Sequence, residues 1–297
     1  MFRRFGAVVA VVAGLAVGGT GTAAGAVAQN GPPDAPVTDI AHRGASAYAP
    51  ENTLAAVDAA AQHDATTVEV DVQRSKDGEL VLMHDTTLER TTDAEEVFPG
   101  EDSYEVDRFT LEELRELDAG SWFGPRFAGE PVPTLQEALD RLRAHDLNLL
   151  LEIKSPGRHP GIESDIAREF TRNPEWLAPT RPGGHQRLVI QSFEWDSVRS
   201  SHDRLPMVPH GLLGTVPEAE LDEYAQWADM VNPNHESVDA DYVDSVHDAG
   251  MGMFVYTVND AADMRSALDK GVDGLISDYP DVAREVIAEE TGARPRP

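Results

Sequence analysis

Three carboxylates stand on two short apolar stretches of the sequence. Glu69 and Asp71 alternate with valines in VEVDV (68–72), and Glu152 follows three leucines in LLLEI (149–153). Residues two apart on a strand project to one face, so Glu69 and Asp71 share a side. Carboxylates crowded inside an apolar fold repel one another unless a cation lies between them. Three oxygen donors in a chain without cysteine favour Mg²⁺ or Ca²⁺ over zinc.

Two histidines and two basic residues stand at the ends of apolar runs. His42 and Arg43 close TDIAHR (38–43), His84 closes LVLMH (80–84), and Lys154 follows the second carboxylate stretch. Histidine exchanges protons near neutral pH, and Arg or Lys beside it can hold a phosphate or serve as a counter-ion of the carboxylates. These residues predict a metal-dependent phosphodiesterase site. The histidines at positions 185, 202, 210 and 247 lack such a context and are expected on the surface.

Four further residues allow two interpretations each. Glu51 is either a distant metal ligand or an anchor for His42, and we favour the anchor. Asn52 and Thr53 can cap the helix that follows PENT (50–53), a role that we assign first to Thr53. Tyr256, in YTVN (256–259), either lines the pocket or packs in the core. We expect Glu51 and Asn52 to support the site from behind and Tyr256 to contact the substrate.

Strand and helix patterns alternate along most of the chain. Apolar and β-branched runs predict strands at 38–42, 66–72, 147–153, 188–191, 207–213, 230–231, 253–258 and 274–277. Helical patterns separate them, and Thr134 caps one of these helices. Eight β-then-α units in about 250 residues predict an α/β fold, the (β/α)8 TIM barrel. The catalytic residues of such barrels lie at the carboxyl ends of the strands.

A further apolar run, residues 80–84, follows the second strand after the short turn SKDG (75–78). A parallel crossover needs about a dozen residues or more, so this run must return antiparallel, outside the eight barrel strands. An Asp-Gly turn centred between 77 and 78 pairs residues whose numbers sum to 155, which sets His84 opposite Asp71. Residues 86–133 lack a strand pattern and are too long for an ordinary connection, so we expect a small insertion that borders the site.

The N-terminal residues predict export. Residues 1–28 combine the basic start MFRR, an apolar run at 7–17 and the small-residue site AVA (26–28), the pattern of a secretory signal peptide cleaved near Ala28. A membrane anchor is the alternative, but the apolar run is short for a span. A flexible lead-in at 29–37, the barrel domain at 38–288 and a tail at 289–297 complete the predicted organisation of a secreted or extracytoplasmic protein.

The composition limits the partners. Without Arg3 and Arg4, 22 of the 24 basic residues remain against 53 acidic ones, which leaves a formal charge of −31. Such a surface repels nucleic acid and anionic membranes, so we expect neither as a partner and no stable membrane insertion. Because cysteine is absent, the protein must fold without disulfides on a core drawn from 41% apolar residues. The sequence does not predict the oligomeric state.

Longer stretches of the chain resemble a known family. HRGASAYAPENT (42–53), EVDVQRSKDGELVLMHD (69–85), TLERTTD (87–93), LDAGSWF (117–123), LEIK (151–154), QSF (191–193), YTVN (256–259) and DGLISDYP (273–280) resemble the glycerophosphodiester phosphodiesterases. The resemblance spans residues 39–280. It implies a TIM barrel with a small insertion, a divalent metal, and hydrolysis of a small-molecule glycerophosphodiester to glycerol 3-phosphate and an alcohol.

The resemblance also implies roles for individual residues. It places the general acid/base pair on His42 and His84, the metal ligands on Glu69, Asp71 and Glu152, and the phosphate contacts on Arg43 and Lys154. The family usually has tryptophan where Tyr256 stands, near the glycerol end of the pocket, and a Gly-Ala-Asp where this chain has DAT (64–66). The first departure leaves the exact substrate open. The sequence distinguishes neither the acid from the base, nor a water nucleophile from the substrate's own hydroxyl.

Two alternative enzymes share this barrel: a phospholipase D-like enzyme acting on lysolipids or sphingomyelin, and a teichoic-acid-type hydrolase. The long 86–133 segment and the lack of an apolar membrane-binding loop argue against the first. A non-catalytic exported binding protein is the alternative from another class. Such a protein is expected to have lost a histidine or a metal ligand, and this sequence keeps them all.

Overall fold

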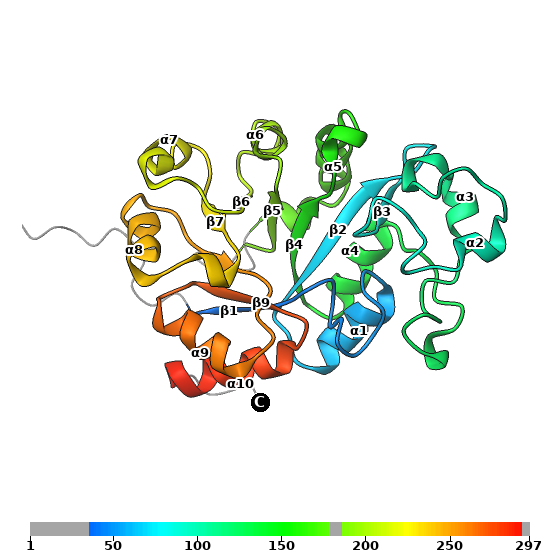
Figure 1. The fold of residues 1–297 in the computed structure, drawn as a ribbon. Coiled ribbons are helices and arrows are strands. Elements are labelled where there is room, and N and C mark those ends of the chain that lie inside the picture. Colours follow the sequence, from blue (N-terminus) through cyan, green and yellow to red (C-terminus); the bar gives the residue numbers. More distant parts are fainter. Residues whose placement is uncertain (1–35, 179–185, 293–297) are drawn as a thin grey trace, which may run out of the picture. The chain divides into compact units, whose positions relative to one another are not determined.

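Eight parallel strands form the centre of the fold in a computed structural model that describes residues 36–178 and 186–292. Their bounds are β1 (Thr38–Ala41), β2 (Thr67–Arg74), β4 (Asn148–Ile153), β5 (Leu188–Ser192), β6 (His210–Leu213), β7 (Met230–Asn232), β8 (Phe254–Val255) and β9 (Gly274–Ser277). They lie in the order β7-β6-β5-β4-β2-β1-β9-β8 (Figure 1). Isolated parallel bridges Met230–Gly252 and Asn234–Tyr256 join β7 to the β8 segment. The sheet is therefore a nearly closed barrel, and the predicted (β/α)8 fold is confirmed.

A helix follows each barrel strand along the chain, ahead of the next barrel strand where one comes after it. These helices are α1 (Leu54–Gln62), α4 (Leu135–Ala144), α5 (Ile162–Arg172), α6 (Trp195–His202), α7 (Leu221–Tyr224), α8 (Ala240–Asp248), α9 (Ala261–Asp269) and α10 (Pro280–Thr291). Short 3₁₀ turns border them at η3 (Pro156–Arg158), η4 (Pro174–Leu177), η5 (Glu218–Glu220) and η6 (His235–Ser237). Thr53 caps α1 through the Ala56 N–H, and Thr134 forms a capping box with Glu137 on α4, as the sequence predicted.

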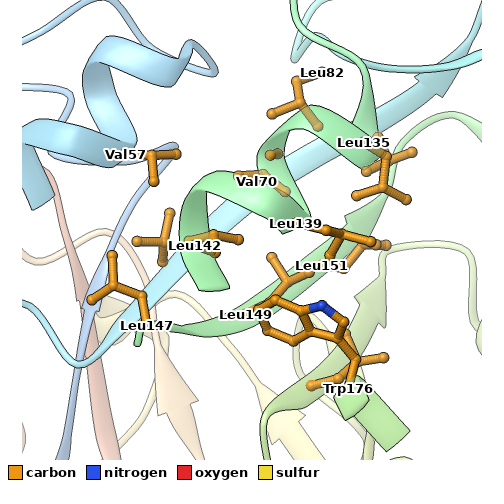
Figure 2. Close-up of a cluster of buried hydrophobic side chains, with 14 of the residues drawn as sticks. Val57, Val70, Leu82, Leu135, Leu139, Leu142, Leu147, Leu149, Leu151 and Trp176 are labelled. Atoms are coloured by element: carbon orange, nitrogen blue, oxygen red, sulfur yellow. The ribbon is translucent and has the colours of Figure 1, made fainter. Parts of the chain in front are cut away.

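The two-residue periodicity of β2 and β4 decides which side chains enter the barrel. Val68, Val70 and Val72 point outward, as do Leu149, Leu151 and Ile153, and all six pack in the cluster beneath α1 and α4. Figure 2 shows α4 lying over both strands with its leucines against this surface. The alternate residues face the interior, where Ile40, Leu150 and Ile276 fill the barrel. Glu69, Asp71 and Glu152 belong to this inward set.

The run after β2 forms β3 (Leu80–Leu82), which pairs antiparallel with β2 and lies outside the barrel order, as predicted. The predicted register was wrong by one residue. Val72 pairs with Leu82, so paired numbers sum to 154. Asp71 lies opposite Met83, and the backbone carbonyl of Asp71 accepts the Met83 N–H at 3.0 Å. The cause is the turn: Gly78 adopts φ +97°, and a three-residue loop replaces the two-residue loop that we assumed. His84 therefore lies one residue past Met83, the residue opposite Asp71.

The predicted insertion is a small unit with its own core. It contains α2 (Ala94–Val97), η1 (Val106–Arg108), α3 (Leu111–Leu114) and η2 (Pro125–Phe127). Leu88, Phe109 and Leu114 pack here with Val81 and Met83 of the β3 segment. The insertion is thus fixed to the strand whose end carries His84.

Other boundaries shift slightly from the prediction. Strand β6 begins at His210 instead of residue 207, after Pro209, which has no N–H to donate. His210 is fully buried rather than at the surface: its Nδ1 donates to the Val208 carbonyl at 2.7 Å, and its Nε2 lies 3.0 Å from Ser201 Oγ. The histidines at 202 and 247 are partly exposed, and position 185 lies outside the described residues. Helix α10 includes residues 289–291 of the predicted tail.

The predicted signal peptide and most of the lead-in also lie outside the described residues. Among the helices that the structure describes, none has the length and apolar character needed to cross a membrane.

Candidate active site

Glu69, Asp71 and Glu152 form one buried cluster at the barrel interior. Each offers a carboxylate oxygen, and these oxygens lie within 4.8 Å of one another. Two features of the sheet bring them together: residues 69 and 71 share a face of β2, and Asp71 is the direct register partner of Glu152 on β4. Glu69 Oε2 accepts the Arg43 N–H at 2.7 Å, whereas Glu69 Oε1 is buried without a hydrogen-bond partner among the described residues. An acceptor-only atom in that position suits a cation.

The electrostatics of the cluster also suit a cation. Burial, together with the charges of Asp71 and Glu152, raises the pKa of Glu69 well above its usual range. Burial and the Asp71 charge raise the pKa of Glu152 to about 7. Burial also acts to raise the pKa of Asp71, but the charges of Lys154 and Arg43 outweigh it and lower that pKa. Three negative charges at this spacing are thus costly alone, and the residues fit a hard divalent cation.

Arg43 and Lys154 lie beside the carboxylates. Lys154 Nζ donates to Glu152 Oε1 at 2.6 Å and lies 3.4 Å from Asp71 Oδ1, and Arg43 Nε lies 3.5 Å from Asp71 Oδ2. Arg43 has φ +55°, and Gly44 follows at φ +82°, where an added Cβ would lie 2.5 Å from Ala56 Cβ. The tight turn at the end of β1 therefore needs glycine and holds the arginine over the cluster. Lys154 is thus a counter-ion of Glu152 and Asp71, and the Arg43 side chain pairs with Asp71 rather than with Glu69.

His42 is held by a residue from the other end of the chain. Its Nδ1 donates to Asp278 Oδ1 at 2.6 Å, and Ser46 Oγ and Asn259 Nδ2 donate to the same carboxylate at 2.9 and 2.7 Å. Burial acts to raise the pKa of Asp278, but the hydrogen bond and charge of His42 lower it. The predicted anchor of His42, Glu51, is wrong. The register of β1 on β9 brings Asp278 to this place instead.

His84 has a similar partner in the next residue. Its Nδ1 donates to Asp85 Oδ1 at 2.8 Å, and Arg90 Nε donates to Asp85 Oδ2 at 2.5 Å. Burial acts to raise the pKa of Asp85, but the bonds from Arg90 and His84 lower it to about 2. For His84 itself, burial is the largest effect and lowers the pKa, aided by the charge of Arg43 and opposed by Asp71. Each histidine thus presents Nε2 as the ring nitrogen that is not bonded to its carboxylate.

Asn52 and Glu51 were both predicted to support the site, and the structure places them on different partners. Asn52 Nδ2 donates to Asp71 Oδ2 at 2.8 Å, and Asn52 Oδ1 accepts the Asp71 N–H at 3.0 Å, so Asn52 orients a carboxylate of the cluster. Glu51 accepts from Arg43 Nη1 at 2.9 Å and from both terminal nitrogens of Arg90. It therefore anchors Arg43 rather than His42, because the turn after β1 points the arginine toward it.

A cavity of about 460 Å³ opens over these groups. Both histidines, Arg43, Lys154, Glu69 and Glu152 line one part of it. The ends of β5 to β8 line the rest, with Phe193, Leu213, Glu236 and Tyr256 among the residues there. Its volume is in the usual range for a small-molecule site. Tyr256 lines this cavity and packs edge to face on Phe193, with ring centroids 5.8 Å apart.

Comparisons with known proteins identify the family of this chain. The sequence model described as the "Glycerophosphoryl diester phosphodiesterase family" matches residues 42–282. A glycerophosphodiester phosphodiesterase of Bacillus subtilis (strain 168) is 34% identical over 264 residues, which cover 84% of this chain and 86% of that protein. Another, from Caldanaerobacter subterraneus subsp. tengcongensis, is 36% identical over 250 residues and covers 82% and 94%. The chain belongs to the glycerophosphodiester phosphodiesterase family.

A solved structure of the same kind extends the match to three dimensions. A phosphodiesterase of Oleispira antarctica, in complex with the product sn-glycerol-3-phosphate, matches with a TM-score of 0.73 and 30% identity over 84% of this chain and 96% of that one. The predicted resemblance and the enzyme class, a glycerophosphodiester phosphodiesterase, are thereby confirmed.

Several residues that the structure places near the site received no individual role from the sequence. Asp278, Arg90 and Phe193 lie in DGLISDYP, TLERTTD and QSF, stretches that carry the resemblance but had no assigned role. Gln191 of β5 lines the cavity and accepts from Asn232 Nδ2 at 2.8 Å. For Asp278, Gln191 and Phe193 the available signal was the position at the carboxyl end of a strand. Arg90 had no such signal, because its segment has no strand pattern.

Proposed function

We propose that this enzyme hydrolyses glycerophosphodiesters to glycerol 3-phosphate and an alcohol, using one divalent cation and a pair of histidines. The observation that carries the proposal is the cavity itself. His42 and His84 line the same 460 Å³ space as Glu69, Glu152 and the basic side chains of Arg43 and Lys154, so one bound phosphodiester can meet all of them. Membership of the family and the product complex of the Oleispira antarctica relative support the choice of substrate.

Glu69, Asp71 and Glu152 would hold the cation, Mg²⁺ or Ca²⁺, which when bound neutralises charge on the phosphoryl oxygens. Arg43 and Lys154 would bind the phosphate beside the cation. Both are cationic, fixed by the carboxylates and exposed to the cavity, so they can bind the remaining phosphate oxygens and stabilise the charge that grows there during displacement.

The histidines would transfer the protons. In-line displacement places the attacking and leaving oxygens on opposite sides of phosphorus, so an acid and a base are needed at two positions. Asp278 and Asp85 fix the Nδ1–H tautomers of His42 and His84, which leaves each Nε2 to take or give a proton. The attacking group is either a water or the substrate's own glycerol hydroxyl, and either histidine can serve as the acid.

The substrate's organic arms would lie along Phe193 and Tyr256. These rings form an apolar wall of the cavity with Leu213, and the Phe193 ring centroid lies 5.8 Å from Lys154 Nζ. A glycerol backbone or an alkyl head group buries its carbon atoms against such a wall. Tyr256 takes the place of the family's usual tryptophan and so bears on the choice of head group.

We also propose that the enzyme acts outside the cytoplasm. The support is the basic start, apolar run and small-residue site of residues 1–28. Expression of the full chain in a bacterial host, followed by N-terminal sequencing of the protein outside the cytoplasm, tests this. A mature chain beginning near residue 29 is expected, and full-length protein retained in the cytoplasm would contradict it.

The function itself is tested by release of glycerol 3-phosphate from glycerophosphocholine. Purified enzyme is assayed with a chelator, and then with Ca²⁺ or Mg²⁺ restored in excess. Activity is expected to disappear with the chelator and to return with one or both cations. A protein that releases no glycerol 3-phosphate from any glycerophosphodiester under these conditions would refute the function, and full activity in the chelator would refute the role of the cation.

A further inference from the structure

The backbone around His84 is held by Gln73, on the part of β2 that pairs with β3. This side chain is fully buried on β2, and its Nε2 donates to the carbonyl oxygens of Met83 at 2.9 Å and Asp85 at 2.6 Å. On its other side, Gln73 Oε1 lies 3.2 Å from Nε2 of the buried His159. The main chain of residues 83–85 is therefore fixed, and what remains free is the rotation of the side chains.

The rotation of the His84 ring depends on Asp85, and Asp85 depends on Arg90. Asp85 is partly exposed, with 29% of its side chain accessible, so burial alone does not hold it. Arg90 donates two hydrogen bonds to the Asp85 carboxylate, from Nε to Oδ2 at 2.5 Å and from Nη2 to Oδ1 at 3.1 Å. A paired contact of this kind fixes both the position and the plane of a carboxylate.

Arg90 is itself fixed against a firm support. Its Nη1 and Nη2 donate to the two oxygens of Glu51 at 2.8 and 2.7 Å. The Glu51 side chain is only 12% exposed and is held in turn by Arg43. The neighbours of Arg90 in the chain, Leu88 and Thr91, are buried in the insertion. One planar guanidinium thus bridges two carboxylates, a geometry that lysine cannot reproduce.

We propose that Arg90, carried by the insertion, is a positioning residue that fixes the His84 imidazole through Asp85, with Glu51 as the fixed support. This inference rests on the proposed function, because it assigns a task to His84. It gives the insertion a part in the reaction: the segment supplies the residue that orders one histidine of the pair. Arg90 is not among the residues that line the cavity, so it acts through its neighbours.

A double-mutant cycle tests the proposal. Arg90→Gln removes the paired contacts, and Arg90→Lys keeps the charge but not the bridge; each is made in the wild-type and the His84→Ala enzyme. Release of glycerol 3-phosphate is measured with the cation present. Arg108→Gln is the matched control, since Arg108 lies in the same insertion, is 57% exposed and pairs with Glu105. Thermal unfolding of every variant reports on the fold.

In the wild-type background, Arg90→Gln is expected to lower kcat roughly 10- to 100-fold, because a misplacement of about 1 Å costs on that order. The kcat of Arg90→Lys is expected to lie between those of Arg90→Gln and the wild type. The kcat of Arg108→Gln is expected to equal that of the wild type. In the His84→Ala background Arg90→Gln is expected to cost less than about threefold, because the group that it positions is gone. A purely structural role would lower kcat equally in both backgrounds.

Two results would overturn the inference: a kcat within about twofold of wild type for Arg90→Gln, or equal losses in both backgrounds. If Arg90→Gln does not fold, Arg90→Lys decides, and an unchanged kcat in that variant overturns the proposal. A wild-type enzyme without activity would instead overturn the proposed function, so the two failures are distinguishable.

Discussion

Replacing Glu69 with glutamine separates the metal site from the stability of the barrel. The variant keeps an oxygen that can accept the Arg43 N–H, and it places an NH₂ group where the unpartnered Oε1 stands. That group is a donor and cannot bind a cation. In the metal-free protein the change is mild, because burial and the neighbouring carboxylates raise the pKa of Glu69, and glutamine resembles the protonated acid. We therefore expect Glu69→Gln without metal to melt within about 2 °C of wild type or above it.

The effect of added cation should be large and one-sided. At a free cation concentration about 1,000 times Kd, binding stabilises the wild type by about 4.1 kcal/mol. If losing a carboxylate weakens the site by about 100-fold, the same concentration gives the variant only about 1.4 kcal/mol. A domain of this size shifts by about 2–4 °C per kcal/mol, so the expected rise in Tm is about 8–16 °C for the wild type and 3–6 °C for the variant.

Thermal unfolding in chelator, and then with excess Ca²⁺ or Mg²⁺, measures both quantities. Glu236→Gln is the matched control, because Glu236 lines the same cavity outside the cluster, and its rise in Tm should equal that of the wild type. An undiminished metal-induced rise in Glu69→Gln would show that the cation binds elsewhere. A metal-free variant that melts far below wild type would show that Glu69 has a structural role instead.

Three further predictions follow from the site and the core. His42→Ala and His84→Ala should each lower kcat by about 10²–10⁴ while preserving the metal-induced rise in Tm, and a nitrophenyl phosphodiester should rescue only the variant that lost the acid; equal rescue would refute separate roles. Tyr256→Trp should keep that rise in Tm but change the ratio of kcat/KM between glycerophosphocholine and glycerophosphoethanolamine, and an unchanged ratio would place Tyr256 outside substrate recognition. Burial lowers the pKa of His210 to about 4 from an ordinary 6.5, so the unfolded chain gains this proton first as pH falls. The stability that this group contributes is complete above about pH 6.5 and declines by about 3 kcal/mol toward pH 4. Urea unfolding at pH 7.5 and at pH 5 should therefore show a smaller loss of unfolding free energy in His210→Gln than in the wild type.

Much of the fold could be read from local pattern. The valines of β2 alternate with Glu69 and Asp71, and this period of two required that the two acids face the interior together. The short turn after β2 required an antiparallel β3, since no parallel crossover fits in so few residues. The pairing itself was wrong by one residue, because loop length depends on the left-handed backbone of Gly78, which the Asp-Gly dipeptide alone does not specify.

The supporting contacts of the site could not be derived in this way. Glu51 is near His42 in sequence but turns to Arg43 and Arg90, because the turn at Gly44 directs the arginine and not the histidine toward it. His210 was misplaced because nothing in its neighbours shows that a polar ring ends inside the core with both nitrogens paired.

The sequence by itself determined the chemistry: the kinds of groups, their places at strand ends, and the face of β2 and β4 on which the carboxylates lie. These are local properties, fixed by side-chain type and by the two-residue repeat of a strand. Tertiary structure alone decided which group orients His42. Asp278 reaches His42 across 236 positions of sequence, and it does so because β9 pairs with β1 and closes the barrel. Such a contact depends on the register of paired strands and on the order of the whole sheet, so no window of the sequence contains it.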